Sequence, residues 1–336
     1  MSWLTLIDVI RKFNGARVAI IKKVRTLVNS NVYKINHPTL PKNTHIVCMS
    51  PAQKILYDPI VYGMKLRRHA LECSKTFIKI ALEMVPGFKK LGSREISEIV
   101  VLRGSLGYQF DTVFEQLFDR YLPQCFVGAR RFRISGGEFG ADIFYTNFDA
   151  LPDNGVLFTG DTIATGVSLG QTLSVTRSEL RERGYDVRKL LVLSIAASFD
   201  GCKKLREWEE RFREWWPNFN IHLFVAEALF GLADNGTDLL FRHENAAIVP
   251  EETKKRVEQL YGDYETGFLP GNMCSIFDWG DRNFKPERHL DDIIMFTKKS
   301  MKVAKDARAK KVLEELEENA KLALKKLEQP LIKSRR

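Results

Sequence analysis

Short apolar runs alternate with stretches of helical periodicity between residues 98 and 226, and this alternation constrains the fold more than any other feature. The apolar runs are EIVVL at 98–102, a short run near 124–127, VLF at 156–158, KLLVLSI at 189–195 and IHLFVA at 221–226. Helices are expected within 58–90 and at 107–121, 168–183 and 203–216. Strands that alternate with helices in this way predict an α/β fold, with a mainly parallel sheet flanked by helices.

Composition divides the chain into three parts. Residues 1–50 are predicted to be a basic, helical N-terminal extension that ends in a Pro/Asn-rich loop, and residues 51–292 are predicted to form the α/β domain. Residues 293–336 are expected to be a charged C-terminal helix. Its narrow apolar stripe consists of Val312, Leu316, Ala320, Ala323 and Leu327. Residues 298–336 hold 13 Lys/Arg and 6 Asp/Glu, so this segment carries +7 of the net charge of +10.

Neither a membrane segment nor a disulfide framework is expected from this sequence. No apolar run approaches the ~20 residues that a membrane helix needs. The N-terminus carries Asp8 inside its short apolar stretch and lacks the features of a signal peptide. The five cysteines are far apart and form no C-x-x-C pair. We therefore expect a reduced, cytoplasmic protein that does not contact a membrane.

The stretch GVLFTGDTIATGVSLG at 155–170 is typical of an anion-binding turn. An apolar strand ends at Asp161, and Thr165, Gly166 and Ser168 stand at the start of the next helix. Free backbone N–H groups, hydroxyls and the helix dipole favour a phosphate at such a place. The alternative is an ordinary strand, glycine turn and helix that bind nothing.

Two common phosphate-binding loops do not fit this turn. A nucleoside-triphosphate loop has four residues between its glycines and then a lysine. Here five residues separate Gly160 from Gly166, and Val167 stands in the place of the lysine. The dinucleotide fingerprint G-x-G-x-x-G is also absent.

Three further segments carry residue types that suit an anionic ligand. They are LRGSLGY at 102–108, VGARRFR at 127–133 and IFDWGDRNF at 276–284. Gly104 allows the backbone to approach a diphosphate, and Arg103 supplies fixed charge beside it. A Gly-rich stretch follows the basic cluster at 127–133 and suits a mobile hood over an anionic substrate. Asp278 and Asp281 flank a glycine in the third segment.

These segments resemble those of the type I phosphoribosyltransferases, and most closely the uracil phosphoribosyltransferases. That family carries L-R-A-G-L-G-M, G-x-x-R, a flexible region that ends in K-L-P, D-P-M-L-A-T-G-G-S and G-L-G-D-A-G-D-R. This chain has LRGSLGY, GARR, FDALP, GDTIATGVS and SIFDWGDR in the same order. The resemblance covers about residues 55–290 and implies the phosphoribosyltransferase-like version of the α/β fold.

The resemblance implies that this chain transfers the phosphoribosyl group of phosphoribosyl diphosphate (PRPP) to a pyrimidine or related nitrogenous base and releases diphosphate. Mg²⁺ would enter bound to PRPP, and a homodimer is implied. The implied catalytic residues are Arg103, Arg131, Asp161 and Asp278. The implied PRPP-binding residues are Gly104, Gly160, Asp161, Thr162, Ile163, Ala164, Thr165, Gly166, Val167, Ser168 and Asp278. The implied base-binding residues are Phe277, Asp278 and Trp279.

The chain departs from the family at two places, and these departures leave alternatives open. Gly160 stands where the family has an acidic residue, so Asp161 is the remaining carboxylate of the pair. Phe277 and Trp279 replace small residues beside the base. One alternative is a non-catalytic sensor of PRPP or a nucleotide. Another is a factor that binds RNA or protein through the basic segment 298–336, with the sheet domain as scaffold.

Overall fold

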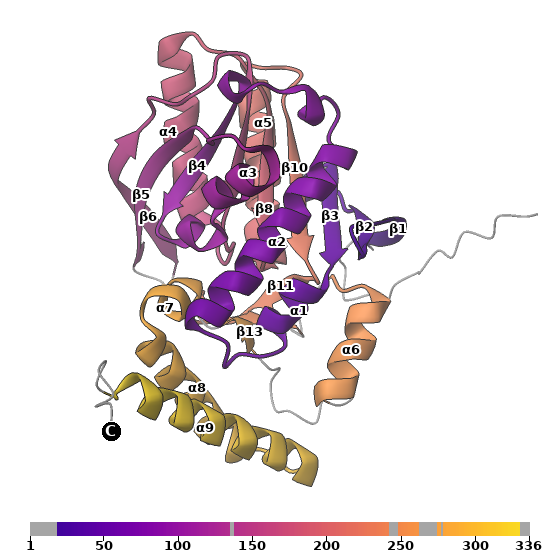
Figure 1. Cartoon of the computed structure of the whole chain (residues 1–336), viewed down its shortest axis with the longest axis vertical. Coiled ribbons are helices and arrows are strands. Elements are labelled where there is room, and N and C mark those ends of the chain that lie inside the picture. Colours follow the sequence, from indigo (N-terminus) through magenta and orange to yellow (C-terminus); the bar gives the residue numbers. More distant parts are fainter. Residues whose placement is uncertain (1–18, 135–137, 242–247, 262–273, 277, 330–336) are drawn as a thin grey trace, which may run out of the picture.

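A nine-stranded sheet forms the centre of the computed structural model, which describes residues 19–134, 138–241, 248–261, 274–276 and 278–329 (Figure 1). In spatial order the strands are β1 (Ile20–Leu27), β2 (Ser30–Asn36), β3 (Asn43–Cys48), β10 (Asn220–Ala226), β8 (Val187–Ser194), β7 (Gly155–Gly160), β4 (Ile96–Leu102), β5 (Gln124–Arg133) and β6 (Phe139–Asn147). The six strands from β3 to β5 run parallel, and the three remaining strands at the two edges pair antiparallel. The predicted α/β fold with a mainly parallel sheet is therefore confirmed.

Helices cover both faces of this sheet. One face carries α1 (Ser50–Leu56), α2 (Gly63–Met84) and α3 (Phe110–Phe118), and the other carries α4 (Val167–Arg183) and α5 (Phe199–Arg213). Side chains alternate between the faces along each strand. Phe158 of β7 therefore packs in the core under α2 and α3, whereas its neighbour Leu157 packs under α4 and α5. Burial on both faces explains why the central strands read as continuous apolar runs.

A smaller four-stranded sheet follows the carboxyl ends of β8 and β10. Its order is β13 (Cys274–Ile276), β12 (Leu239–Leu240), β11 (Leu229–Leu232) and β9 (Ala197–Ser198). The remaining helices are the 3-10 helices η1 (Phe88–Lys90), η2 (Ser93–Glu95) and η3 (Gly104–Tyr108), with α6 (Glu251–Tyr261), α7 (Trp279–Phe284), α8 (Pro286–Met301) and α9 (Ala307–Leu327). No helix among the described residues is long and apolar enough to cross a membrane.

Residues 20–48 differ from the predicted N-terminal extension because they belong to the main sheet. They form β1 to β3, and β3 pairs with β10 in parallel register. Val32, Ile35 and Ile46 are buried, while most side chains of β1 are exposed. The exposed basic side chains of β1 dominate the composition of this segment and conceal the apolar face of β2 and β3. Residues 1–18 of the predicted helix lie outside the described residues.

The C-terminal region also differs from the prediction, because it holds two helices rather than one. The helical conformation is interrupted between α8 and α9. Asp306 caps α9 there by accepting hydrogen bonds from two first-turn N–H groups. Leu316 and Ala320 of the predicted stripe are buried in one cluster with Leu290 of α8. The apolar stripe of α9 is therefore covered within the same chain, and the two helices lie side by side in Figure 1.

Candidate functional site

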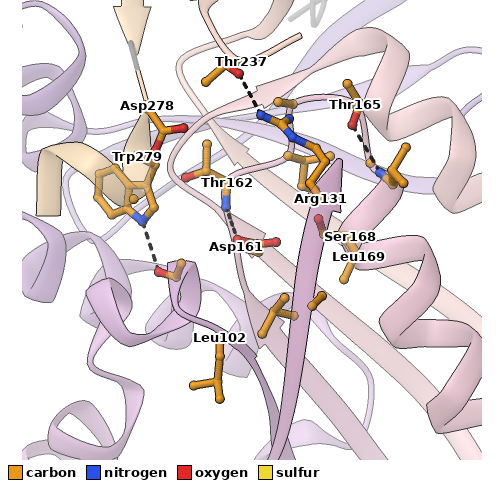
Figure 2. Close-up of a pocket in the computed structure, with 18 residues that line it drawn as sticks. Leu102, Arg131, Asp161, Thr162, Thr165, Ser168, Leu169, Thr237, Asp278 and Trp279 are labelled. Carbon is orange, nitrogen blue, oxygen red and sulfur yellow. Dashed lines mark hydrogen bonds between the residues drawn. The ribbon is translucent and has the colours of Figure 1, made fainter. Parts of the chain in front are cut away.

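A cavity of about 190 Å³, here called the strand-end cavity, lies at the carboxyl ends of β4 and β7. It is lined by residues 161–169 together with Gly104, Arg131, Thr237, Asp278 and Trp279, among others. Figure 2 shows Asp278 and Trp279 on one side, Ser168 and Leu169 on the other, and Asp161 between them. The four sequence segments that suit an anionic ligand thus each contribute to one cavity. It lies where α/β proteins bind ligands.

The loop after β7 is held in place by the small sheet. The Ile163 N–H donates to the Ala196 carbonyl oxygen at 3.0 Å, and the Ser198 N–H donates to the Ile163 carbonyl oxygen at 2.7 Å. The Ser198 hydroxyl also donates to the Ala164 carbonyl oxygen. Ile163 itself is buried. These bonds fix the path of the loop without using the side chains that face the cavity.

The loop ends at Gly166, which adopts φ of +70° and precedes the first turn of α4. A side chain there would be strained, and its Cβ would lie 2.7 Å from a carbonyl oxygen of α5. The Val167 N–H donates to the Thr165 hydroxyl at 3.4 Å. The N–H groups of Ser168 and Leu169 have no acceptor within the helix, as is usual in a first turn. These donors at a positive helix end favour an anion.

Asp161 contributes the carboxylate nearest to this loop. Its Oδ1 accepts the Thr162 N–H at 2.8 Å, and its own carbonyl oxygen accepts the Ser194 hydroxyl at 2.6 Å. A Cβ at position 104 would lie 2.7 Å from Asp161 Oδ1, so the glycine makes this close approach possible. Burial raises the pKa of Asp161 to about 7, although the Thr162 N–H and the charge of Arg131 act to lower it.

Arg131 forms another part of the cavity wall. Its Nη1 donates to the Gly236 carbonyl oxygen and its Nη2 donates to Thr237 Oγ1, both at 2.7 Å. Its guanidinium also lies 4.7 Å from the centre of the Phe139 ring. Burial lowers the pKa of Arg131, and the negative charges of Asp278 and Asp161 raise it. These bonds join β5 to the β11–β12 turn at the wall of the cavity.

Asp278 and Trp279 position α7 against η3. Asp278 Oδ1 accepts the Asp281 N–H at 2.8 Å and so caps α7. The buried Trp279 donates its indole N–H to the Gly104 carbonyl oxygen at 3.1 Å. Asp281 instead forms an ion pair with Arg288 at 3.1 Å, and it does not line the cavity. The segment 276–284 therefore contributes one carboxylate to the cavity rather than two.

Gly160 lies against aromatic rings and does not line the cavity. A Cβ at this position would lie 2.4 Å from Phe110 Cε2 and 2.7 Å from Tyr108 Cγ. The Tyr108 hydroxyl accepts the Ile195 N–H at 2.9 Å, which holds the ring in place. The space that an acidic side chain would need is therefore filled. This packing gives a physical reason for glycine at the first position of the predicted acidic pair.

A further predicted residue, Arg103, does not line the cavity. Arg103 is exposed, and its guanidinium lies 5.2 Å from the centre of the Phe284 ring. The peptide bond that precedes it, Leu102–Arg103, is cis. Phe277, predicted to contact a base, lies outside the described residues.

Some features of the cavity were not anticipated. Residues 139–147, predicted to be part of a mobile hood, form the edge strand β6, and residues 135–137 lie outside the described residues. Thr237 lines the cavity from the β11–β12 turn. The Asn235-Gly236 pair is a recognisable turn signal. A turn signal does not reveal which distant strand the turn will contact, so this wall could not be found from the sequence.

No protein-family model matches the chain, and no curated protein matches it. Among the described residues, no group of three or more His, Cys, Asp and Glu side chains is placed to hold a metal ion. In the described part of the chain, the charged groups that line the strand-end cavity are Arg131, Asp161 and Asp278. This set, with the donors at the start of α4, can bind an anionic group at one end and hydroxyl or cationic groups beside the carboxylates.

Proposed function

We propose that the strand-end cavity binds the phosphoribosyl group of PRPP, and that the chain transfers this group to a nitrogenous base with release of diphosphate. The observation that carries the proposal is the loop 161–168, which faces Arg131 and Asp278 across a single cavity. The identity of the ligand comes from the resemblance of these segments to the type I phosphoribosyltransferases.

The ligand is placed by matching its groups to the donors and acceptors around the cavity. The 5′-phosphate lies at the start of α4, where the Ser168 and Leu169 N–H groups and the Thr165 hydroxyl are available. The ribose hydroxyls donate to the Asp161 carboxylate. Pockets for complete ligands measure roughly 300–1000 Å³. The volume of about 190 Å³ therefore suits the phosphoribosyl part, with diphosphate and base toward the opening.

The reaction exchanges one bond at C1′ for another. The bond from C1′ to the diphosphate oxygen breaks, a bond from C1′ to a nitrogen of the base forms, and the base loses its proton. Positive charge develops on the ribosyl ring, and the ionised Asp161 stabilises it. Arg131 stabilises the negative charge of the departing diphosphate, and Mg²⁺ is delivered as part of the substrate. Asp278 and Trp279 border the incoming base.

A second candidate function is a sensor that binds the phosphoribosyl ligand without transfer. Two observations favour it over a plain transferase. Gly160 has no room for the acidic side chain that the family uses to hold a ribose hydroxyl. Arg103 stacks on Phe284 outside the cavity, so one of the two expected diphosphate contacts is missing from the wall.

The test is a calorimetric titration of the full chain with PRPP and Mg²⁺, with diphosphate release followed in the same samples across a panel of free bases. Transfer predicts saturable binding and release that depends on one base. Binding without release for any base supports the sensor. A folded protein that does not bind PRPP would overturn both functions.

Asp161→Asn supplies the matched variant for this titration. The neutral amide keeps the size of the side chain and can still accept the Thr162 N–H, but it removes the charge. We expect PRPP binding to weaken by about tenfold to a hundredfold, as for a charge-assisted hydrogen bond. Asp200→Asn is the control, because Asp200 is an exposed carboxylate paired with Lys203.

The homodimer and nucleic-acid binding by the tail stay predictions from the sequence.

A further inference from the structure

A second cavity, here called the Glu98 cavity, has a volume of about 330 Å³. Some of the same helices form its walls and those of the strand-end cavity, but no residue lines both cavities. Side chains of alternate residues point to opposite faces of a strand. Glu98 and Val100 of β4 thus line the Glu98 cavity, whereas Val101 lines the strand-end cavity. The 3-10 helix η3 and α7 separate the two and contribute to both.

Glu98 is the unusual residue of this cavity. Glu98 belongs to β4 of the main sheet, and only 2% of the residue is exposed. Oε2 accepts the Gln124 Nε2 at 2.8 Å. The other carboxyl oxygen, Oε1, accepts no hydrogen bond from the described residues, and it is not among the fully buried polar atoms that lack a partner, so it reaches the open space of the cavity. A carboxyl group in a residue this buried is costly to ionise unless a cation pairs with it.

The other polar groups of the lining are mostly engaged in holding the walls. The Ser105 hydroxyl accepts the Val101 N–H at 2.9 Å, and Gln109 Nε2 donates to the Arg67 carbonyl oxygen at 2.8 Å. Asn283 Nδ2 donates to the Trp279 carbonyl oxygen at 2.9 Å. The polar walls are therefore pre-formed, and Glu98 is the interior group left to bind a ligand.

The apolar and charged parts of the lining define what that ligand should be. Val100 and the ring of Phe110 supply a buried apolar surface, and Phe284 supplies a half-exposed ring. Apolar walls favour a flat body, and a buried carboxyl oxygen favours a cationic N–H group. Asp111 and Arg67 are the other charged residues of the lining, and both are exposed, so water screens their charges.

We propose that the Glu98 cavity is a second ligand-binding site, which takes a flat organic cation of the amidine type and pairs it with the Glu98 carboxylate. Amidines present two parallel N–H donors to the two oxygens of a carboxylate. The site does not depend on the proposed phosphoribosyl function, because its ligand contacts none of the residues that line the strand-end cavity.

This pairing has a proton signature. Burial raises the pKa of Glu98 to about 8, while the Gln124 amide lowers it and Asp111 raises it. Glu98 is thus mainly protonated at pH 7 in the free protein, and a bound cation favours its ionised form. Binding of one amidinium ion should then release up to about one proton, and affinity should rise between pH 6 and pH 8.

The experiment is calorimetric titration of the full chain with benzamidine at pH 7, in buffers of different ionisation enthalpy so that proton release is counted. We expect benzamidine to bind with proton release, and the uncharged benzamide to bind at least about tenfold more weakly. Glu98→Gln should lose at least about tenfold in benzamidine affinity and lose the proton release. Glu115→Gln, an exposed change of the same kind on α3, should leave both unchanged.

A second variant keeps the test valid if Glu98→Gln perturbs folding. Thr112→Trp extends a large ring from α3 into the cavity without changing Glu98 and should also weaken benzamidine binding. Thermal unfolding of each variant checks that it is folded. No benzamidine binding by the wild-type protein, or equal binding and equal proton release by the wild type and a folded Glu98→Gln, would overturn the proposal.

Discussion

The two cavities on either side of η3 are built in different ways. In the strand-end cavity the loop is fixed by bonds from main-chain groups, such as the pairing of Ile163 with Ala196 and Ser198. Glycines allow the chain to pass close to its neighbours there, as at Gly104 and Gly166. In the Glu98 cavity the walls are held by side chains, and one buried carboxyl supplies the chemistry.

This difference has a consequence for how each cavity responds to substitution. Recognition by backbone N–H groups depends on the path of the chain, so changes that move the backbone should damage the strand-end cavity most. Recognition by one carboxyl depends on the identity of that side chain. A conservative change at Glu98 should therefore remove binding while leaving the fold intact.

The largest effect is expected for Gly160→Asp. The new Cβ would meet the Tyr108 and Phe110 rings at 2.4 to 2.7 Å, and the carboxylate would be buried without a cation. Overpacking and an unpaired buried charge together should lower the free energy of unfolding by about 4 kcal/mol or more, measured by urea denaturation. Gly92→Ala is the control, because its methyl would have ordinary contacts, and it should change stability by about 1 kcal/mol or less. A fully stable Gly160→Asp protein would show that the rings can move aside.

The next largest effect is a pH dependence of the free energy of unfolding, to which Glu98 of one cavity and Asp161 of the other both contribute. The folded pKa of Glu98 is raised to about 8, from an ordinary value near 4, because burial favours the neutral form. Its contribution to stability is therefore complete below pH 4 and is lost as pH rises through 8. Asp161, with a folded pKa of about 7, behaves in the same direction.

Glu98→Gln should therefore gain stability relative to the wild type between pH 5 and pH 9, by on the order of 3 kcal/mol. Asp161→Asn should show a smaller gain, since it lies nearer to solvent. Denaturant unfolding at both pH values measures the differences, with Glu115→Gln as the exposed control. If the free energy of unfolding changed equally with pH in both variants and in the wild type, neither carboxyl group would be held neutral in the folded protein.

A smaller effect is expected for Ser198→Ala. The hydroxyl caps α5 by accepting the Gly201 N–H at 2.7 Å and donates to the Ala164 carbonyl oxygen. Loss of this cap should cost about 1–2 kcal/mol of stability. PRPP binding should weaken as the loop loosens, while benzamidine binding stays unchanged. Asp306→Ala removes a cap from α9, far along the chain, and should reduce stability by a similar amount without affecting either ligand. If Ser198→Ala and Asp306→Ala changed PRPP binding equally, the proposed role of Ser198 in holding the loop would be contradicted.

The smallest effect is expected for Trp279→Phe, which removes the hydrogen bond from the indole N–H to the Gly104 carbonyl oxygen. The cost should be about 1 kcal/mol, the usual value for one hydrogen bond. Because α7 and η3 form walls of both cavities, small losses of affinity are expected for both PRPP and benzamidine. Trp215→Phe, at a half-exposed tryptophan, is the control for the change of ring. A loss confined to one ligand would show that the wall between the cavities is not shared.

The central strands and helices could be predicted because their signals are local. The predicted strand at 156–158 and helix at 168–183 match β7 and α4 closely. Apolar runs, glycine turns and helical spacing act through neighbouring residues, so they are readable from the sequence. The N-terminal strands were missed because the prediction also depended on local signals. The exposed lysines of β1 make the local composition basic, and a basic segment was interpreted as an extension outside the domain.

The candidate site was predictable in its parts but not in its geometry. The turn at 160–166 was predicted from its residue types, and Arg131 and Asp278 were implied by the family resemblance; the structure brings all three to one cavity. The outward position of Arg103 and the contact of Thr237 with Arg131 depend on residues far away in the chain. Glu98 was read as part of a buried strand, and nothing in its local sequence marks it as the carboxyl of a second cavity.

The sequence by itself determined the alternation of strands and helices, the turn at 160–166 and the residue types that suit an anion. These depend on backbone sterics and on periodic apolar patterns, which act over a few residues. The tertiary structure alone decided that Gly160 packs against Tyr108 and Phe110, and that η3 and α7 separate two cavities. Strand order and the packing of helices on each face bring these distant residues together, and that packing is a property of the whole chain.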